Sequence, residues 1–271
     1  MKKNITLMDG ATGTRLWELA EAAGYERSAT WRYNIEHPEL VEQVAKEYIA
    51  AGSRLLCSNS FAVNRFELSH FPDAPAAGEI AAAAVRIDRA AAAGTDVKVA
   101  LDIGPLPRMM EPYGDLTPEE AADCYAEILE GGMTERPDVI YFETFNSLDM
   151  LCAGLKAAKK YDAPVLCSMS FERHGKTLMG DAPADIARTL EAMGAAAVGL
   201  NCSFGPKAAL PVIREFAAHT SLPLILKPNA DAGTTAEAFA AELSVALELV
   251  DYIGACCGSN PDFICALKAL L

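Results

Sequence analysis

Residues 139–169 read VIYFETFNSLDMLCAGLKAAKKYDAPVLCSM, and this stretch decides the fold class. Two short apolar runs, 139–142 and 165–169, are separated by a longer segment with helical periodicity. Strands that alternate with helices in this way predict a parallel sheet, because each helix carries the chain back to the start of the next strand. The stretch is therefore typical of one unit of an α/β fold.

The same alternation extends in both directions along the chain. Six further apolar runs bring the number of predicted strands to eight, at residues 5–8, 55–58, 97–103, 197–201, 222–226 and 252–255. No linker or low-complexity segment interrupts them, and the short Gly-rich phosphate fingerprint of dinucleotide-binding folds is missing. The sequence thus predicts a single closed (β/α)8 barrel domain over residues 1–271, in preference to an open doubly wound sheet.

Signals for the ends of helices support this count independently. Pro38 and Gly52 bracket one predicted helix, and Thr117-Pro118-Glu119-Glu120 has the capping-box pattern before a helix to about Gly131. Thr235 precedes a helix predicted for residues 236–250, and Asn260 precedes the last helix.

Composition excludes several classes of protein. A net charge of −14 opposes binding to nucleic acid, and no apolar stretch is long enough to span a membrane. The N-terminal residues 1–9 do not resemble a signal peptide, so we expect a cytoplasmic protein. The eight cysteines are then expected to be thiols and metal ligands, with a group of five acting as small core residues: Cys57, Cys124, Cys152, Cys167 and Cys265.

The other three cysteines follow predicted strands. Cys202 comes after the sixth apolar run, and Cys256 and Cys257 come at the end of the eighth, where Gly258 permits a turn. The carboxyl ends of barrel strands meet at one face, so we expect these side chains to converge. Three thiolates favour Zn2+ and leave one of its tetrahedral positions open, although three buried thiols without a metal remain an alternative.

The sulfur ligands also indicate the chemistry. Three thiolates make zinc a poor Lewis acid for activating water, but they suit a substrate thiol that binds as a thiolate and attacks an alkyl donor. A zinc hydrolase is a weaker alternative, since none of the four histidines ends a predicted strand.

Five motifs, in the same order and over essentially the whole chain, resemble the homocysteine S-methyltransferase family. They are Met8-Asp9-Gly10-Ala11-Thr12-Gly13-Thr14, Ser58-Asn59-Ser60-Phe61, Phe142-Glu143-Thr144-Phe145, Gly199-Leu200-Asn201-Cys202 and Gly254-Ala255-Cys256-Cys257-Gly258. The resemblance implies a zinc-containing (β/α)8 barrel that binds homocysteine as a thiolate and methylates it to methionine. The three zinc cysteines of the family match Cys202, Cys256 and Cys257.

The resemblance also implies roles for other residues. Asp9 and Glu143 would hold the substrate's amino group, and backbone amides near Ala11 and Ser60 would hold its carboxylate. The remaining positions implied are Gly10 in the first substrate loop, Asn229 near the metal, and Asn201 as a support of the zinc loop. Ala11 and Ala255 replace glycines common in the family, and we expect each added methyl group to narrow the pocket or shift a backbone amide.

The methyl donor is inferred from two further stretches. Residues 61–65 and 102–117 resemble the homocysteine module of cobalamin-dependent methionine synthases. This implies a methylcorrinoid donor, on a separate protein or as free methylcobalamin, because no cobalamin domain is expected in this chain. S-methylmethionine or another donor or thiol acceptor, and a noncatalytic zinc barrel that binds a corrinoid protein, remain alternatives; the oligomeric state is left open.

Overall fold

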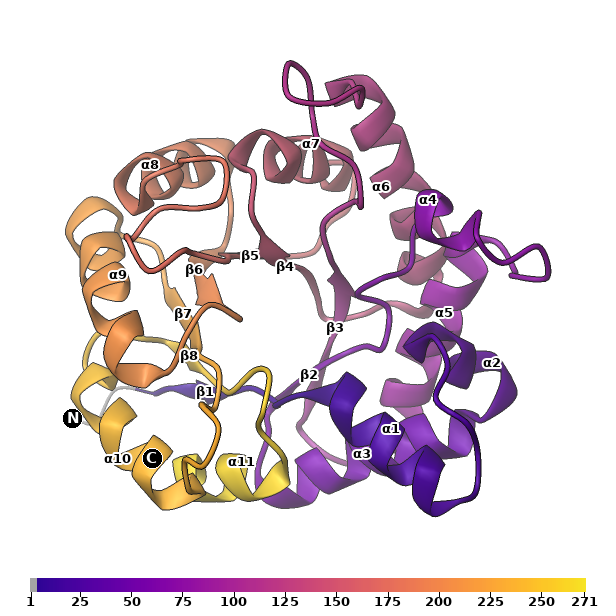
Figure 1. Cartoon of the computed structure of the whole chain (residues 1–271), viewed down its shortest axis with the longest axis horizontal. Coiled ribbons are helices and arrows are strands. Elements are labelled where there is room, and N and C mark those ends of the chain that lie inside the picture. Colours follow the sequence, from indigo (N-terminus) through magenta and orange to yellow (C-terminus); the bar gives the residue numbers. More distant parts are fainter. Residues whose placement is uncertain (1–3) are drawn as a thin grey trace.

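A closed parallel barrel forms the centre of the molecule in the computed structural model, which describes residues 4–271 (Figure 1). Within them, eight strands pair in the order β1-β8-β7-β6-β5-β4-β3-β2. A bridge between Met8 and Leu55 joins the two outermost strands, so the sheet closes on itself and the predicted (β/α)8 barrel is confirmed. The strands are β1 (Thr6–Leu7), β2 (Leu55–Cys57), β3 (Lys98–Ile103), β4 (Val139–Phe145), β5 (Val165–Met169), β6 (Ala197–Asn201), β7 (Leu224–Lys227) and β8 (Tyr252–Ile253).

Helices form a ring around these strands (Figure 1). Eight of them lie between successive strands or after the last one: α3 (Pro38–Ala51), α5 (Ala77–Ala91), α6 (Pro118–Gly132), α7 (Leu148–Ala158), α8 (Pro183–Met193), α9 (Pro206–His219), α10 (Ala236–Leu243) and α11 (Pro261–Lys268). The loops after β1 and β2 add helices that the alternation did not predict: α1 (Thr12–Ala22), α2 (Tyr33–Glu36), α4 (Arg65–Leu68) and the 3-10 turn η1 (Thr30–Arg32). In the described part of the chain, no helix has the length and apolar character needed to cross a bilayer.

Most predicted helix ends are found in the structure. Helix α3 begins at Pro38 and ends at Ala51, and Gly52 caps it with a left-handed φ of 116°. Thr117 and Glu120 complete the capping box of α6. The prediction for residues 236–250 was wrong at its end: α10 stops at Leu243 and the 3-10 turn η3 (Ser244–Ala246) follows. The Ser244 hydroxyl donates to the Ala241 carbonyl, an interaction that competes with helix continuation.

Strand β4 is longer than predicted. It continues to Phe145, with a register shift relative to β5 between Phe142 and Phe145. Glu143 and Thr144 therefore lie within the strand, and Thr144 adopts a left-handed φ of 63°. The irregularity bends the end of the strand, as bulges commonly do beside active sites.

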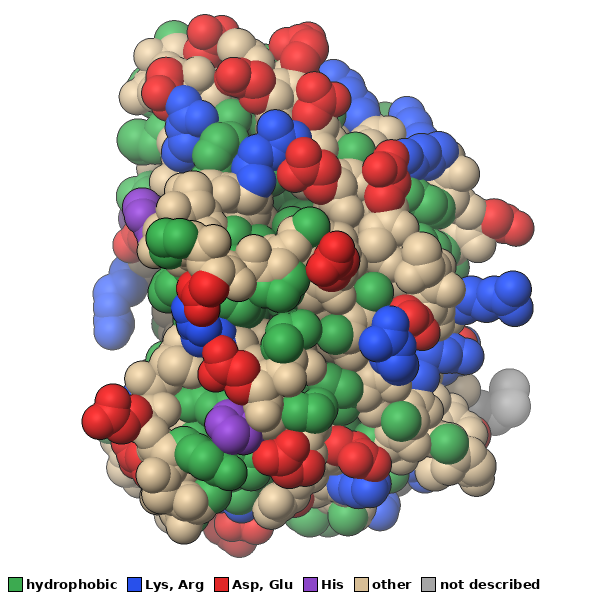
Figure 2. Space-filling model, turned by 90° about the vertical axis from the view of Figure 1, so that its right-hand side faces the viewer, with side chains coloured by type: hydrophobic (Ala, Val, Ile, Leu, Met, Phe, Trp, Pro, Cys, Tyr) green, Lys and Arg blue, Asp and Glu red, His purple; other side chains and the backbone are tan. Residues whose placement is uncertain are grey.

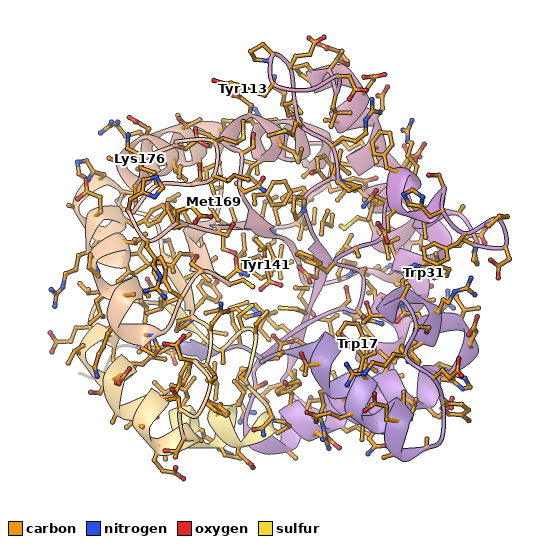
Figure 3. All side chains as sticks on the ribbon, viewed as in Figure 1. Trp17, Trp31, Tyr113, Tyr141, Met169 and Lys176 are labelled. Carbon is orange, nitrogen blue, oxygen red and sulfur yellow. The ribbon has the colours of Figure 1, made fainter. Side chains whose placement is uncertain are left out.

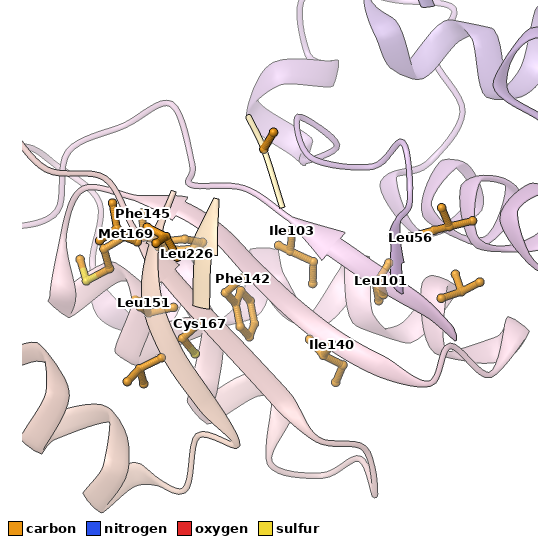
Figure 4. Close-up of a cluster of buried hydrophobic side chains, with 14 of the residues drawn as sticks. Leu56, Leu101, Ile103, Ile140, Phe142, Phe145, Leu151, Cys167, Met169 and Leu226 are labelled. Carbon is orange, nitrogen blue, oxygen red and sulfur yellow. The ribbon is translucent and has the colours of Figure 1, made fainter. Parts of the chain in front are cut away.

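Alternation along the strands creates two apolar layers. One set of side chains fills the barrel interior, among them Tyr141, which points to the centre in Figure 3. The alternate set, including Phe142 and Cys167, packs outward against the helices (Figure 4). The inward positions nearest the carboxyl ends of β3, β4, β6 and β7 are polar: Asp102, Glu143, Asn201 and Lys227.

The five cysteines expected in the core differ in their environments. Cys57, Cys124 and Cys167 are buried, as predicted, but Cys152 is only half-buried and Cys265 is exposed on α11. Cysteine can occupy such positions because it is small and only weakly polar. On the outer face that carries α2, α4 and α5, acidic and basic side chains alternate (Figure 2), and ion pairs such as Arg65–Glu127 join neighbouring helices.

Candidate functional site

Three cysteines converge at the carboxyl end of the barrel. The Sγ atoms of Cys202, Cys256 and Cys257 all lie within 4.8 Å of one another, and those of Cys202 and Cys257 are 3.3 Å apart. Sulfur atoms bound to one tetrahedral zinc at ~2.3 Å would be separated by about 3.8 Å. The spacing and the thiol chemistry of the set therefore fit a soft metal ion.

The loop after β7 holds the two cysteine loops in place. The Cys256 N–H donates to the Pro228 carbonyl at 2.9 Å, and the Ala230 N–H donates to the Cys257 carbonyl at 2.9 Å. On the other side, the Cys202 N–H donates to the Lys227 carbonyl at 3.2 Å. Three consecutive barrel strands thus contribute to one rigid cluster.

Backbone geometry turns the thiols toward each other. Cys202 has a left-handed φ of 45°, and Gly258, directly after the cysteine pair, has a φ of 81°. A left-handed non-glycine residue is uncommon and tends to occur at functional sites. Adjacent residues of a straight strand point to opposite faces, so this turn is what allows Cys256 and Cys257 to face one centre.

The three thiols are electrostatically coupled. Hydrogen bonds from Cys202 and Cys256 lower the pKa of Cys257 to about 3, while hydrogen bonds with Cys202 and Cys257 raise the pKa of Cys256 well above its usual range.

Asn201 links the cysteine cluster to β4 and β5. Its Oδ1 atom accepts hydrogen bonds from the Thr144 N–H at 2.9 Å and the Ser168 hydroxyl at 2.6 Å. Its Nδ2 atom donates to Thr144 Oγ1 at 2.6 Å and lies 3.8 Å from Cys256 Sγ. Asn201 is fully buried, and these four contacts fix the orientation of its side-chain amide.

A cluster of buried charges lies beside the cysteines. Lys227 Nζ donates to Asp9 Oδ1 at 3.1 Å and to Glu143 Oε1 at 2.9 Å, and it lies 3.4 Å from Cys57 Sγ. Burial by itself lowers the pKa of Lys227, but Cys57, Glu143 and Asp9 outweigh burial and raise the pKa well above its usual range. Lys227 is therefore an ammonium ion held between two carboxylates.

Asp102 completes this cluster. Burial, and after it the negative charge of Glu143, raise the pKa of Asp102 well above its usual range. Its Oδ1 atom is buried without a hydrogen-bond partner in the structure. Burial thus disfavours a negative charge on Asp102.

Sequence reasoning assigned no role to Lys227 or Asp102. A signal was present, because a lysine at an inward position of a buried strand must have anionic partners. Using it required the bounds of β7, and the apolar run 222–226 ended one residue too early.

The structure places the other predicted substrate residues around this cluster. Gly10 and Ala11 line the cavity, whereas Ser60 is buried and its hydroxyl donates to the Asp102 carbonyl at 2.7 Å. The Ala11 N–H donates to Ser259 Oγ at 3.1 Å, and the Ser60 N–H donates to the Ser58 carbonyl at 2.7 Å. The N–H groups of Ala11 and Ser60 themselves therefore have partners within the chain, and binding of a carboxylate by the amides near them stays a prediction.

Asn229 lies in the β7 loop that supports Cys256 and Cys257. Its N–H donates to the Phe204 carbonyl at 3.0 Å, and its Oδ1 atom is buried without a hydrogen-bond partner. An unpaired buried acceptor is uncommon, which suits an oxygen that binds a metal or a donor group.

A cavity of about 430 Å³ opens above these groups. The residues that line it include the three cysteines, Glu143, Lys227 and the first turn of α1. Helix α1 has Ala11 at its N-cap position and no side-chain cap, so its first N–H groups can bind an anion. The cavity combines a thiol-rich cluster, a buried ion cluster and an anion-binding helix end.

Comparisons with known proteins agree with this architecture. The profile of the Homocysteine S-methyltransferase family matches residues 6–271. The methionine synthase of Mycobacterium leprae is 25% identical over 97% of this chain and 24% of its own length. Betaine--homocysteine S-methyltransferase 1 of Rattus norvegicus is 26% identical over 91% of this chain and 68% of its own length.

Solved structures support the fold. The metallated form of the homocysteine methyltransferase MmuM from Escherichia coli has a TM-score of 0.83 at 23% identity, covering 99% of this chain and 96% of that one. The carboxyl transferase domain of Rhizobium etli pyruvate carboxylase has a TM-score of 0.56 at 14% identity, covering 99% of this chain and 47% of that one. The chain spans about a quarter of the methionine synthases that it matches.

Proposed function

The chain belongs to the homocysteine S-methyltransferase family, and on that premise we propose that it transfers a methyl group to the thiolate of homocysteine, giving methionine. The observation that carries the proposal is the convergence of Cys202, Cys256 and Cys257 on one point at the edge of the cavity. A cluster of three thiols beside a ligand-sized cavity suits a thiol acceptor better than it suits water.

Cys202, Cys256 and Cys257 are the residues that would hold Zn2+. When bound, zinc would supply a centre at which the acceptor thiol, with an ordinary pKa of ~8.5, is held as a thiolate near neutral pH. Asn201 fixes the position of Cys256 through its hydrogen bonds to Thr144 and Ser168. Asn229 offers a free oxygen from the adjoining loop.

The protein's own groups position the acceptor. The uncapped first turn of α1 is suited to the acceptor's carboxylate, through its N–H groups and the positive end of the helix dipole. The resemblance makes Asp9 and Glu143 the partners of the amino group. Glu143 lines the same cavity together with Lys227, and Asp9 is buried and hydrogen-bonded to Lys227. The sulfur then attacks the methyl carbon in line: the S–C bond forms, and the donor leaves with the electron pair of its former bond to the methyl group.

The donor we propose is a methylcorrinoid, carried by a separate protein or supplied as free methylcobalamin. The resemblance of residues 61–65 and 102–117 to methionine synthases supports this choice. The relatives include both methionine synthases and betaine--homocysteine methyltransferases, so the family alone leaves the donor open.

Metal analysis followed by an assay tests the metal, the acceptor and the donor together. Methionine formation from homocysteine would be measured with methylcobalamin and with S-methylmethionine in parallel. We expect about one zinc per chain, from the single three-cysteine set in residues 4–271, and turnover with methylcobalamin. Turnover with S-methylmethionine alone would reassign the donor, and zinc without transfer from either donor would indicate a noncatalytic barrel.

Replacing one ligand tests the role of the cysteine cluster. We expect Cys257→Ala to lose bound zinc and methyl transfer together, since two thiols rarely hold zinc tightly. Cys265→Ala is the matched control because Cys265 is exposed on α11, outside the cysteine cluster. Full activity in Cys257→Ala would contradict the proposed metal site.

A further inference from the structure

The cradle formed by Asp9 and Glu143 is already occupied by a side chain of the protein. The Lys227 ammonium lies 3.1 Å from Asp9 Oδ1 and 2.9 Å from Glu143 Oε1, and its side chain is only 3% exposed. Its Nζ atom also lies 5.6 Å from the centre of the Tyr141 ring, a cation–π distance. An α-amino group of a substrate would present the same chemical group, an ammonium, to the same two carboxylates.

Little of this cradle remains open to a second ammonium. Asp9 Oδ1 is bound by Lys227, Asp9 Oδ2 accepts the Cys57 N–H at 2.6 Å, and the Asp9 side chain is only 2% exposed. The Glu143 side chain is 11% exposed, and one of its oxygens is also bound by Lys227. A substrate ammonium that reached both carboxylates would have to displace Lys227.

Displacement is unfavourable in this geometry. Lys227 is the last residue of β7 and is paired in register with Asn201 of β6, so its backbone cannot move away without breaking the barrel. The side chain would have to leave a double ion pair, and two ammonium ions sharing the cradle would repel each other at low dielectric.

We propose that Lys227 is a specificity-determining residue, a built-in ammonium that replaces the substrate's α-ammonium between Asp9 and Glu143. The acceptors of this enzyme are therefore thiols that carry a carboxylate, whether or not they carry an α-ammonium. The cysteine cluster still selects the thiol, and the first turn of α1 still selects the carboxylate. This inference rests on the proposed function, since it names the acceptor class of the same site.

Binding of three thiols to the zinc-loaded wild-type protein tests the inference. Homocysteine carries both end groups, 4-mercaptobutyrate lacks the ammonium, and 3-mercaptopropylamine lacks the carboxylate. Their dissociation constants would be measured by calorimetry, and their methylation by methylcobalamin would be followed in parallel.

We expect 4-mercaptobutyrate to bind within about threefold of homocysteine, because a charge-assisted hydrogen bond that is not made contributes no affinity. We expect 3-mercaptopropylamine to bind about tenfold or more weakly, since it cannot use the helix N-terminus. Tighter binding of homocysteine than of 4-mercaptobutyrate by about tenfold or more would overturn the inference.

A variant of Lys227 gives a second measure. Lys227→Met shortens the side chain by one atom and removes the ammonium from the cradle, so we expect homocysteine to become preferred over 4-mercaptobutyrate by about tenfold or more. An unchanged ratio of the two constants in a folded variant would contradict the proposal. If the variant does not fold, because two buried carboxylates then lack a partner, the wild-type comparison decides the question.

Lys176→Met is the matched control. Lys176 is exposed and lies away from the barrel centre (Figure 3), so this change removes a positive charge without touching the cradle. We expect its ratio of dissociation constants to equal that of the wild type. If none of the three thiols binds or is methylated, the proposed function is wrong as well; if they bind but homocysteine is strongly preferred, only the role of Lys227 is wrong.

Discussion

Single residues connect the cysteine cluster to the rest of the barrel. Asn201 does so with both the oxygen and the nitrogen of its side-chain amide. Replacing Asn201 by Ala would remove the acceptor of the half-buried Thr144 N–H and of the buried Ser168 hydroxyl. We expect the unfolding free energy to fall by about 1–3 kcal/mol for this loss. We expect zinc affinity to fall by about 10–100-fold, as is typical when the support of a metal ligand is removed.

Urea unfolding and competition with a chromophoric chelator would measure these two effects. Asn64→Ala is the control, because Asn64 is also buried and caps α4, away from the cysteine cluster. It should lose about 1 kcal/mol of stability with no change in zinc affinity. Equal zinc affinities of Asn201→Ala and the wild type would show that Asn201 does not support the metal site.

A role was predicted from the sequence for Asn201 but not for Lys227. Asn201 is adjacent to Cys202 in the sequence, so local spacing was enough to single it out. The partners of Lys227 are Asp9, 218 residues away, and Glu143, 84 residues away. The sequence marks Lys227 as buried only once β7 is known to extend to it.

Among the structural elements, the loop after β8 determines how Cys256 and Cys257 face Cys202. A Cβ atom at Gly258 would lie 2.3 Å from the Ala230 carbonyl oxygen, in addition to the strain of a φ of 81°. Because Ala230 also binds the Cys257 carbonyl, relieving this clash must move the cysteine loop. We expect Gly258→Ala to lose about 1–3 kcal/mol beyond the backbone strain, together with most of its zinc affinity.

Gly233→Ala isolates the contribution of the clash. Gly233 has a similar φ of 83°, but a Cβ atom there would meet nothing within 4 Å. This control should show the backbone strain alone and bind zinc like the wild type, as measured by thermal unfolding and zinc titration. Similar losses in both variants would mean that the clash with Ala230 has no effect.

For the whole molecule, zinc should act as a clamp between distant parts of the chain. Cys202 follows β6, and the other two ligands follow β8, 54 and 55 positions later in the sequence. A ligand that binds only the folded state stabilises it, by about 4 kcal/mol at a concentration 1,000 times Kd. We expect zinc to raise the unfolding temperature of the wild-type chain and a chelator to lower it, as measured by scanning calorimetry.

Cys257→Ala provides the reference for this experiment. Its unfolding temperature should be insensitive to zinc and to the chelator, since the ligand set is incomplete. A wild-type unfolding temperature that does not respond to saturating zinc would contradict binding at a folded three-cysteine site.

The sequence by itself determined the barrel and the identity of its strand-end motifs. Strand and helix periods are local properties, so the alternation of short apolar runs with helical segments was sufficient to predict eight parallel strands. It was not sufficient for the extension of β4 to Phe145, the end of α10 at Leu243, or the additional helices after β1 and β2. Those features depend on β-bulges, on side chains that compete for backbone hydrogen bonds, and on the packing of loops. None of these produces a periodic pattern of residues along the sequence.

Only the tertiary structure decided how the strand ends meet. Closure of the barrel brings the three thiols within 4.8 Å of one another and places the Lys227 ammonium between Asp9 and Glu143. Electrostatic interactions and hydrogen bonds act over a few ångströms of space, whatever the separation along the chain. The sequence could therefore single out Asp9 and Glu143 as carboxylates near the ends of strands, whereas the cation that lies between them became visible only in the folded barrel.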